Sequence, residues 1–151
     1  MKPQVKPPVI LLADDDSDDR LLVRDAIAEC TKPAELVCLE NGEQLLDYLC
    51  RRGAFAGSGA APRPGLILLD LNMPRKDGRE ALREIKNDPA LRRIPVVVFT
   101  TSKADTDIAA LYDLGANSFV TKPVQFDRLV EAINRLTEYW FEIVELPVAR
   151  G

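Results

Sequence analysis

Short apolar runs alternate along the chain with longer segments in which apolar residues recur every three or four positions. The length and composition of the short runs predict strands, and the spacing in the longer segments predicts amphipathic helices. The predicted strands lie at residues 9–13, 36–39, 66–70, 95–100 and 118–121. Strands that alternate with helices in this way are typical of an open parallel sheet. We therefore predict a single α/β domain with a doubly wound (βα)5 arrangement.

Residues at the ends of the helical segments predict where the helices begin and end. Ser17 is the candidate N-cap of the first helix, and Asn41 with Gln44 forms a capping-box pattern before the second. Gly115 is expected at the C′ position of the fourth helix, because glycine readily takes the left-handed conformation that ends helices. The last helix is expected to run from about residue 125 to about residue 144.

Composition and charge narrow the classes of function. The net charge is −4 and no dense Lys/Arg run occurs, which argues against a nucleic-acid-binding surface. No apolar stretch approaches the roughly 20 residues of a membrane span, and the amino terminus lacks a signal-peptide pattern, so a cytoplasmic protein is expected. The sequence has no histidine, which excludes histidine-based zinc sites, Ser–His catalysis and a role as phosphohistidine donor.

Polar residues of particular types follow the predicted strands. Asp14 and Asp15 follow the first, Asp70 ends the third, Thr100 ends the fourth and Lys122 follows the fifth. The carboxyl ends of parallel strands meet at one edge of a sheet, which is where ligands bind. Like charges at about 4 Å repel by roughly 4 kcal/mol at an effective dielectric of 20, so a cation would stabilise the carboxylate cluster. Carboxylate oxygens suit Mg²⁺ or Mn²⁺.

Not every aspartate in this acidic stretch is expected to bind metal. Asp16, Asp18 and Asp19 fit the first turn of a helix, where the helix dipole favours negative charge. An EF-hand loop that begins at Asp14 is excluded. Its sixth position is Asp19 rather than glycine, and its twelfth is Asp25 rather than glutamate.

Asp70 is the candidate nucleophile. A carboxylate can accept a phosphoryl group directly and form an acyl phosphate. The protein must then hold a phosphoryl group whose oxygens carry negative charge. A divalent cation would contact one oxygen, the Lys122 ammonium a second and the Thr100 hydroxyl a third. Lys122 alone would be read as an exposed lysine, and its combination with the other strand-end groups favours a functional role.

This combination of motifs resembles the receiver domain of two-component response regulators. The resemblance covers about residues 8–136 and includes the segment LeuAspLeuAsnMetProArgLysAspGly at 69–78. It implies a flavodoxin-like fold with strand order 2-1-3-4-5. It also implies that Asp70 accepts a phosphoryl group from the histidine of a sensor kinase, without the chain itself being an enzyme. Residues 1–8 are expected to be a disordered lead.

The resemblance also assigns roles to individual residues. It implies that Mg²⁺ is held by Asp14, Asp15, Asp70 and the backbone carbonyl of Asn72. Thr100 would be the switch hydroxyl. A cis peptide bond is expected between Lys122 and the proline that follows it.

Phe119 is at the position of the family's switch aromatic residue. Many receivers carry tyrosine or histidine there, whereas the ring of Phe119 has no polar group. Inward rotation of the ring is still expected to be possible, but without a hydrogen bond to stabilise it.

The carboxyl-terminal residues 137–151 carry more apolar side chains than one small domain needs. They are predicted to extend the last helix into a dimer interface, because exposed apolar patches usually mark interfaces. The residues assigned to this interface are Tyr139, Trp140, Phe141 and Ile143. A homodimer through the helix 4/strand 5/helix 5 face is expected. The alternative is that residues 139–147 fold back on their own domain.

The tail and residues 116–123 resemble the single-domain response regulators of phytochrome-type histidine kinases. This resemblance implies such a kinase as the partner. Few residues follow the last strand, so we expect a stand-alone receiver without a DNA-binding domain or membrane anchor.

Two other functions are weighed. A haloacid-dehalogenase-like phosphatase also uses an aspartate nucleophile after its first strand, but Asp18 occupies the Thr/Val position of that motif. A receiver-fold interaction module that no longer needs phosphate is the second alternative, and the full set of strand-end residues argues against it.

Overall fold

The computed structural model describes residues 7–57, 61–101 and 108–147. Residues 1–6, most of the predicted disordered lead, lie outside this description. Five parallel strands form one sheet in the order β2-β1-β3-β4-β5, as predicted. The strands are β1 (Val9–Ala13), β2 (Glu35–Leu39), β3 (Leu66–Leu69), β4 (Val96–Thr100) and β5 (Ser118–Thr121).

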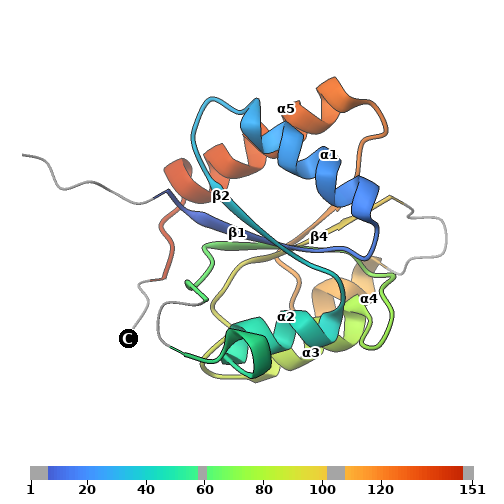
Figure 1. The fold of residues 1–151 in the computed structure, drawn as a ribbon, viewed down its shortest axis with the longest axis vertical. Coiled ribbons are helices and arrows are strands. Elements are labelled where there is room, and N and C mark those ends of the chain that lie inside the picture. Colours follow the sequence, from blue (N-terminus) through green and yellow to red (C-terminus); the bar gives the residue numbers. More distant parts are fainter. Residues whose placement is uncertain (1–6, 58–60, 102–107, 148–151) are drawn as a thin grey trace, which may run out of the picture.

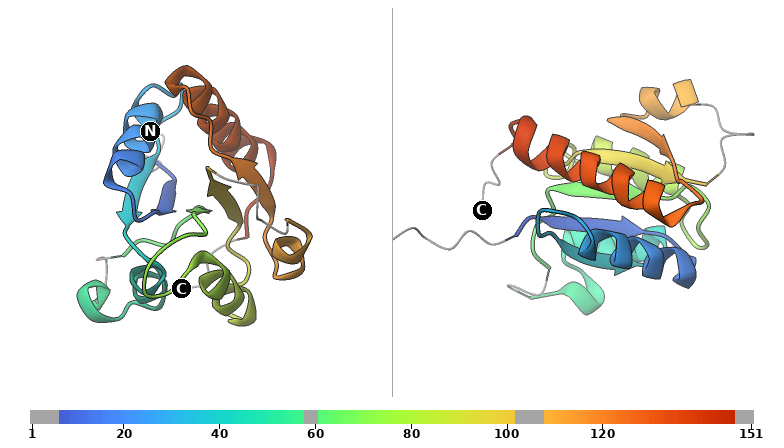
Figure 2. Two further views of the ribbon diagram at one scale, coloured as in Figure 1. Left: turned by 90° about the vertical axis from the view of Figure 1, so that its right-hand side faces the viewer. Right: turned by 90° about the horizontal axis from the view of Figure 1, so that it is seen from above.

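Helices cover both faces of the sheet (Figure 1). Helices α1 and α5 lie side by side on one face, and α2, α3 and α4 lie on the other (Figure 2). The helices are α1 (Ser17–Ala28), α2 (Gly42–Cys50), α3 (Gly78–Asn87), α4 (Ile108–Asp113) and α5 (Phe126–Glu138), with a 3₁₀ turn η1 (Gly53–Phe55) and a π-helical turn η2 (Tyr139–Ile143). None of the helices described is long and apolar enough to cross a membrane.

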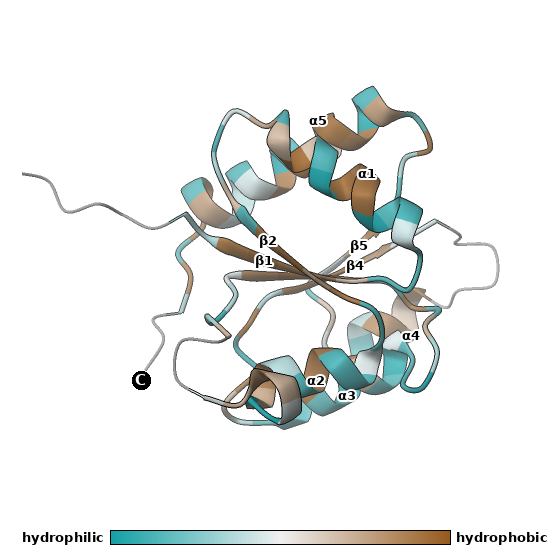
Figure 3. Cartoon of the chain, in the orientation of Figure 1, coloured by the Kyte–Doolittle hydropathy of each residue, from teal (hydrophilic) through white to brown (hydrophobic). Residues whose placement is uncertain are grey.

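Side chains that alternate along each strand supply two separate cores, one on each face of the sheet. Strands β1, β3 and β4 are buried along their whole length, which explains their nearly continuous apolar sequence. Figure 3 shows these apolar strands between helices in which hydrophobic and hydrophilic residues alternate. The helices cover the two faces of the sheet, and polar side chains lie at the carboxyl ends of the central strands.

The residues that cap α2 and end α4 are the ones predicted from the sequence, whereas the residue that caps α1 is not. Asn41 caps α2 by accepting a hydrogen bond from the Gln44 backbone N–H, and Gly115 takes a φ of 110° after α4. At α1 the prediction of Ser17 as N-cap is wrong. Asp16 is the cap, because its carboxylate accepts hydrogen bonds from the backbone N–H groups of Asp18 and Asp19.

The last helix changes its geometry before it ends. The α-helical part of α5 stops at Glu138, and the following turn, η2, has the wider π-helical form. The Glu142 carboxylate pairs with the Lys32 ammonium at 2.7 Å, which ties this turn to the segment after α1. The predicted extent of the helix is therefore confirmed to Ile143, but its last turn is not α-helical.

Candidate metal and phosphoryl site

The carboxyl ends of β1 and β3 bring three carboxylates together. Each of Asp14, Asp15 and Asp70 offers an oxygen, and these oxygens lie within 4.8 Å of one another. The register places Ala13 opposite Leu69, and the Asp70 backbone N–H donates to the Ala13 carbonyl at 3.0 Å. Asp14 is fully buried, whereas Asp15 is exposed. Such an all-oxygen set fits Mg²⁺ or Mn²⁺, with water able to reach the open side.

Lys122 reaches this cluster from the end of β5. Its Nζ atom donates to Asp14 Oδ2 at 2.6 Å and to Asp19 Oδ2 at 3.2 Å. It also lies 5.8 Å from the centre of the Phe99 ring. Burial disfavours the ammonium charge, but the hydrogen bond to Asp14 and the nearby carboxylates outweigh that effect, so the pKa of Lys122 lies above its usual value.

Asp70 is the buried residue of the site that directly follows β3. Burial raises the pKa of its carboxyl group, and a hydrogen bond from the Thr100 hydroxyl together with the charge of Lys122 opposes that rise. Its Oδ1 atom accepts a hydrogen bond from the Leu71 backbone N–H at 2.9 Å. Asp70 is therefore oriented by groups on β4 and β5 as well as by its own loop.

The loop after Asp70 is held close to the site. The Gly78 backbone N–H donates to the Leu71 carbonyl at 2.9 Å, and a Cβ atom at Gly78 would overlap the Asp70 carbonyl. Asp77 caps α3 with its side chain, which fixes where the loop ends. Asn72 lies in this loop and is exposed, two residues after Asp70.

The two predicted switch residues lie on neighbouring strands. Thr100 is buried at the end of β4, and Phe119 is half-buried on β5, opposite Val98. The Phe119 ring packs against the core beneath α2, α3 and α4. The predicted cis bond between Lys122 and Pro123 is wrong: this peptide is trans, the form that X–Pro bonds prefer by about 0.5–1 kcal/mol.

Sequence reasoning missed the contact between Asp19 and Lys122, because it assigned Asp19 to the helix dipole alone. The signal was present in the helix periodicity. Asp19 precedes the buried residues Val23, Ala26 and Ile27 by four, seven and eight positions, so it belongs to the stripe of α1 that faces the sheet.

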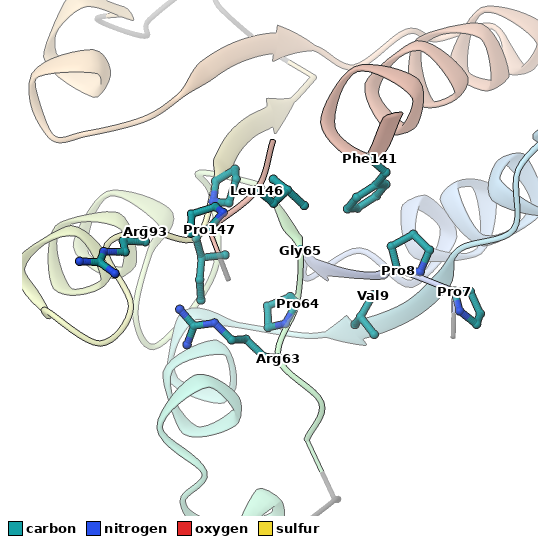
Figure 4. A pocket seen from close by; sticks show the side chains of 12 residues that line it. Pro7, Pro8, Val9, Arg63, Pro64, Gly65, Arg93, Phe141, Leu146 and Pro147 are labelled. Carbon is teal, nitrogen blue, oxygen red and sulfur yellow. The ribbon is translucent and has the colours of Figure 1, made fainter. Parts of the chain in front are cut away.

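The carboxyl-terminal segment lies at the opposite edge of the sheet. There, a hollow of about 350 Å³ is lined by the residues that precede β1, β3 and β4 and by the tail. Figure 4 shows Phe141 and Leu146 beside Gly65 in this hollow. A Cβ atom at Gly65 would lie 2.7 Å from Phe141 Cε1, so the tail sits directly on the backbone.

The four residues assigned to a dimer interface fall into two pairs. Trp140 and Phe141 are half-buried and pack against the core beneath α1 and α5. Tyr139 is 48% exposed and Ile143 is 63% exposed. Trp140 and Phe141 agree with the alternative prediction, in which residues 139–147 fold back, because they contact their own domain. The second pair is the more exposed, although the Tyr139 ring packs edge-on against Trp140.

The fold and the strand-end residues define a receiver domain, and comparison with known proteins agrees. The family described as response regulator receiver domain matches residues 10–134, and the chain belongs to this family. The domain limits predicted at residues 8 and 136 stay predictions.

Among individual proteins, the chain is similar to the response regulator Rcp1 of Synechocystis sp. It is 43% identical to Rcp1 over 143 residues, which cover 95% of each chain. It is 36% identical over 134 residues to FilR2 of Methanothrix harundinacea, a probable methanogenesis regulatory protein, and covers 84% of that protein.

Solved structures show the same relationship. The phosphorylated cyanobacterial phytochrome response regulator RcpA matches with a TM-score of 0.85 at 41% identity, over 95% of this chain and all of that one. The regulator RPA3017, which acts in red light signalling of R. palustris, matches with a TM-score of 0.87 at 38% identity, over 93% of this chain and 99% of that one. Rcp1 has been crystallised with Mn²⁺ bound.

Proposed function

We propose that this protein is a single-receiver response regulator that accepts a phosphoryl group on Asp70 from a sensor histidine kinase. The observation that carries the proposal is the position of Asp70 between the acidic pair of β1 and the Lys122 and Thr100 side chains. The protein is a phosphoacceptor rather than an enzyme that turns over a substrate. Its signal is a conformational change read by other proteins.

The reaction forms one bond and breaks one. An Asp70 carboxylate oxygen attacks the phosphorus atom, and the bond from phosphorus to the donor histidine nitrogen breaks. Asp14, Asp15, Asp70 and the backbone carbonyl of Asn72 would hold Mg²⁺ or Mn²⁺, which when bound neutralises charge on the phosphoryl oxygens. The Thr100 hydroxyl and the Lys122 ammonium, which both interact with Asp70, would donate to those oxygens.

The proposed partner is a phytochrome-type histidine kinase. The similarity to RcpA and to the red-light regulator of R. palustris supports this choice, since both cover nearly the whole chain. A homodimer through α4, β5 and α5 with the tail is part of the proposal. The exposed apolar side chains on these elements that support it are Ile108, Tyr112, Phe126, Tyr139 and Ile143.

The phosphatase alternative does not fit the geometry. It needs an accessible nucleophile directly after β1, and Asp14 is fully buried with its carboxylate bound to Lys122 and to the Asp16 backbone N–H. The phosphate-independent alternative leaves unexplained why the acids, the hydroxyl and the amine are all retained around Asp70.

The test is chemical phosphorylation followed by intact-mass analysis. After incubation with acetyl phosphate and Mg²⁺, the wild-type protein should gain the mass of one phosphoryl group. The Asp70→Asn variant should gain none, and chelation of the metal should prevent the gain in the wild type. An equal gain in the wild type and the variant would contradict Asp70 as the acceptor.

A further inference from the structure

The ammonium of Lys122 is shared by two carboxylates that differ in what they can do. Asp14 is both its nearer partner, at 2.6 Å, and a candidate metal ligand, whereas Asp19, at 3.2 Å, lies on helix α1. We propose that Asp19 is a positioning residue that retains the Lys122 ammonium when Asp14 turns to the metal. This inference rests on the proposed function, because it concerns the same metal and phosphoryl site.

Lys122 cannot easily do without a second acceptor. Its side chain is 5% exposed, so water can replace a lost partner only in small part. An unpaired buried charge is costly, and an ammonium has three N–H donors to satisfy. If a cation took up Asp14 Oδ2, the Lys122 ammonium would lose its shortest hydrogen bond and meet a second positive charge nearby.

Asp19 is placed to compensate for that loss. It lies in the first turn of α1 on the stripe that faces the sheet, its Oδ2 atom accepts a hydrogen bond from Lys122, and it is not one of the three clustered carboxylates. Asp16 already caps the helix, which leaves the Asp19 carboxylate free of that task. With Asp19 holding one N–H, another can turn toward a phosphoryl oxygen on Asp70.

The metal and Lys122 would compete for the Asp14 carboxylate, and Asp19 would reduce this competition by offering Lys122 a second acceptor. Without the Asp19 carboxylate, Asp14 would be the one carboxylate in the described part of the chain that accepts a hydrogen bond from Lys122, with Asp70 contributing only its nearby charge. Metal binding would then have to weaken the main charged contact of a buried ammonium. Metal affinity should therefore fall, and Lys122 should become more reactive once metal is present. An aspartate that acted only by its negative charge would lower metal affinity but would not change the reactivity of Lys122.

The experiment compares Asp19→Asn with Asp18→Asn in the full chain. Asp18 is the matched control, because it lies in the same turn, loses the same charge and is exposed. Mn²⁺ affinity is measured from the paramagnetic resonance signal of free Mn²⁺. Lys122 reactivity is measured by brief acetylation and mass spectrometry, with and without Mn²⁺, relative to the exposed Lys32.

We expect Asp19→Asn to weaken Mn²⁺ binding about three- to tenfold more than Asp18→Asn, the range that one net hydrogen bond implies. Mn²⁺ should increase acetylation of Lys122 in Asp19→Asn and leave it unchanged in Asp18→Asn and the wild type. Asp19→Glu should restore both properties. Equal behaviour of the two asparagine variants would overturn the proposal, as would an unchanged Lys122 in Asp19→Asn.

Failure of this inference can be told apart from failure of the proposed function. If the wild type binds Mn²⁺ and shows the Asp19 effects but Asp70 takes up no phosphoryl group, the proposed function fails and the role of Asp19 stands. If Asp70 is phosphorylated and the two asparagine variants agree, only the role of Asp19 fails. A wild type that binds no Mn²⁺ overturns both.

Discussion

Lys122 shows how one residue can serve stability and function at once. Its ammonium and the Asp14 carboxylate form a buried ion pair that joins the end of β5 to the end of β1 across the sheet. The sequence predicted Lys122 as a phosphoryl contact, whereas in the structure its contacts are with Asp14 and Asp19. In the proposed function, a phosphoryl group on Asp70 would compete with these two carboxylates for the Lys122 ammonium.

Lys122→Met should strongly destabilise the protein, because it leaves Asp14 as an unpaired buried carboxylate. Loss of one partner of a buried pair costs about 3–5 kcal/mol. Urea denaturation monitored by circular dichroism would measure the change. Mg²⁺ should recover part of the loss, because it gives the Asp14 carboxylate a cationic partner. A small destabilisation that Mg²⁺ does not alter would contradict this account.

Asp70 should make the protein less stable as it ionises. Burial raises the pKa of its carboxyl group in the folded state, so the folded protein favours the protonated form more than the unfolded chain does. The contribution of Asp70 to stability is then greatest at low pH and falls as pH rises through the folded pKa. Asp70→Asn should therefore gain stability relative to the wild type at pH 7, and the gain should shrink toward about pH 4. Urea denaturation at both pH values checks this, and a gain that grows on acidification would contradict it.

At the level of elements, the sequence predicted the strands well, because the central strands are buried on both faces and read as continuous apolar runs. Their order was predicted from the resemblance to receiver domains. It placed the cap of α1 one residue late, since Ser17 and Asp16 are both good caps and only the backbone shows which one is used. The π-helical turn η2 could not be predicted. Its residue Phe141 lies against Gly65, a contact between segments far apart in the sequence.

Gly65→Ala should release the tail. The added Cβ would lie 2.7 Å from Phe141 Cε1, so either the ring or the backbone before β3 must move. Overpacking of this kind costs about 1–3 kcal/mol. Limited proteolysis should cut the segment after Glu138 faster in this variant than in the wild type.

The double variant Gly65→Ala/Phe141→Ala provides the control for this prediction. If the two side chains interact only through this contact, the effects of the single changes should not add in the double variant. Additive effects would show that Gly65 influences the tail by another route.

For the whole molecule, the structure changes how the predicted homodimer should be tested. Substitution of Trp140 would remove packing from the protein's own core, so a loss of mass could not be assigned to the interface. Ile143→Asp alters a side chain that is 63% exposed. Light scattering should show a dimer for the wild type and a lower mass for this variant.

Leu21→Asp is the matched control, since Leu21 is an apolar residue that is 56% exposed on α1, which is not part of the proposed α4/β5/α5 face. It should leave the mass unchanged. A monomeric wild type would contradict the dimer, and an equal effect of Leu21→Asp would show that added charge, rather than the tail, is responsible.

The site was more predictable than the tail for a physical reason. Asp14, Asp15, Asp70, Thr100 and Lys122 are each placed by a strand end, so the topology of the sheet alone brings them together. The pairing of Lys122 with Asp19 and the contacts of Trp140 and Phe141 depend on side-chain packing between elements. Strand patterns carry no information about such pairings.

Helix α5 begins soon after Lys122 and runs to the edge of the sheet opposite the acidic cluster, where Trp140 follows it. Its 13 residues span about 20 Å. Trp140 is the one tryptophan in the chain, and none lies beside Asp70. The protein therefore carries a natural fluorophore at the far end of the helix that starts beside the proposed phosphoryl site. Its emission would report any change at that end of the helix, and would be free of direct quenching by a bound metal.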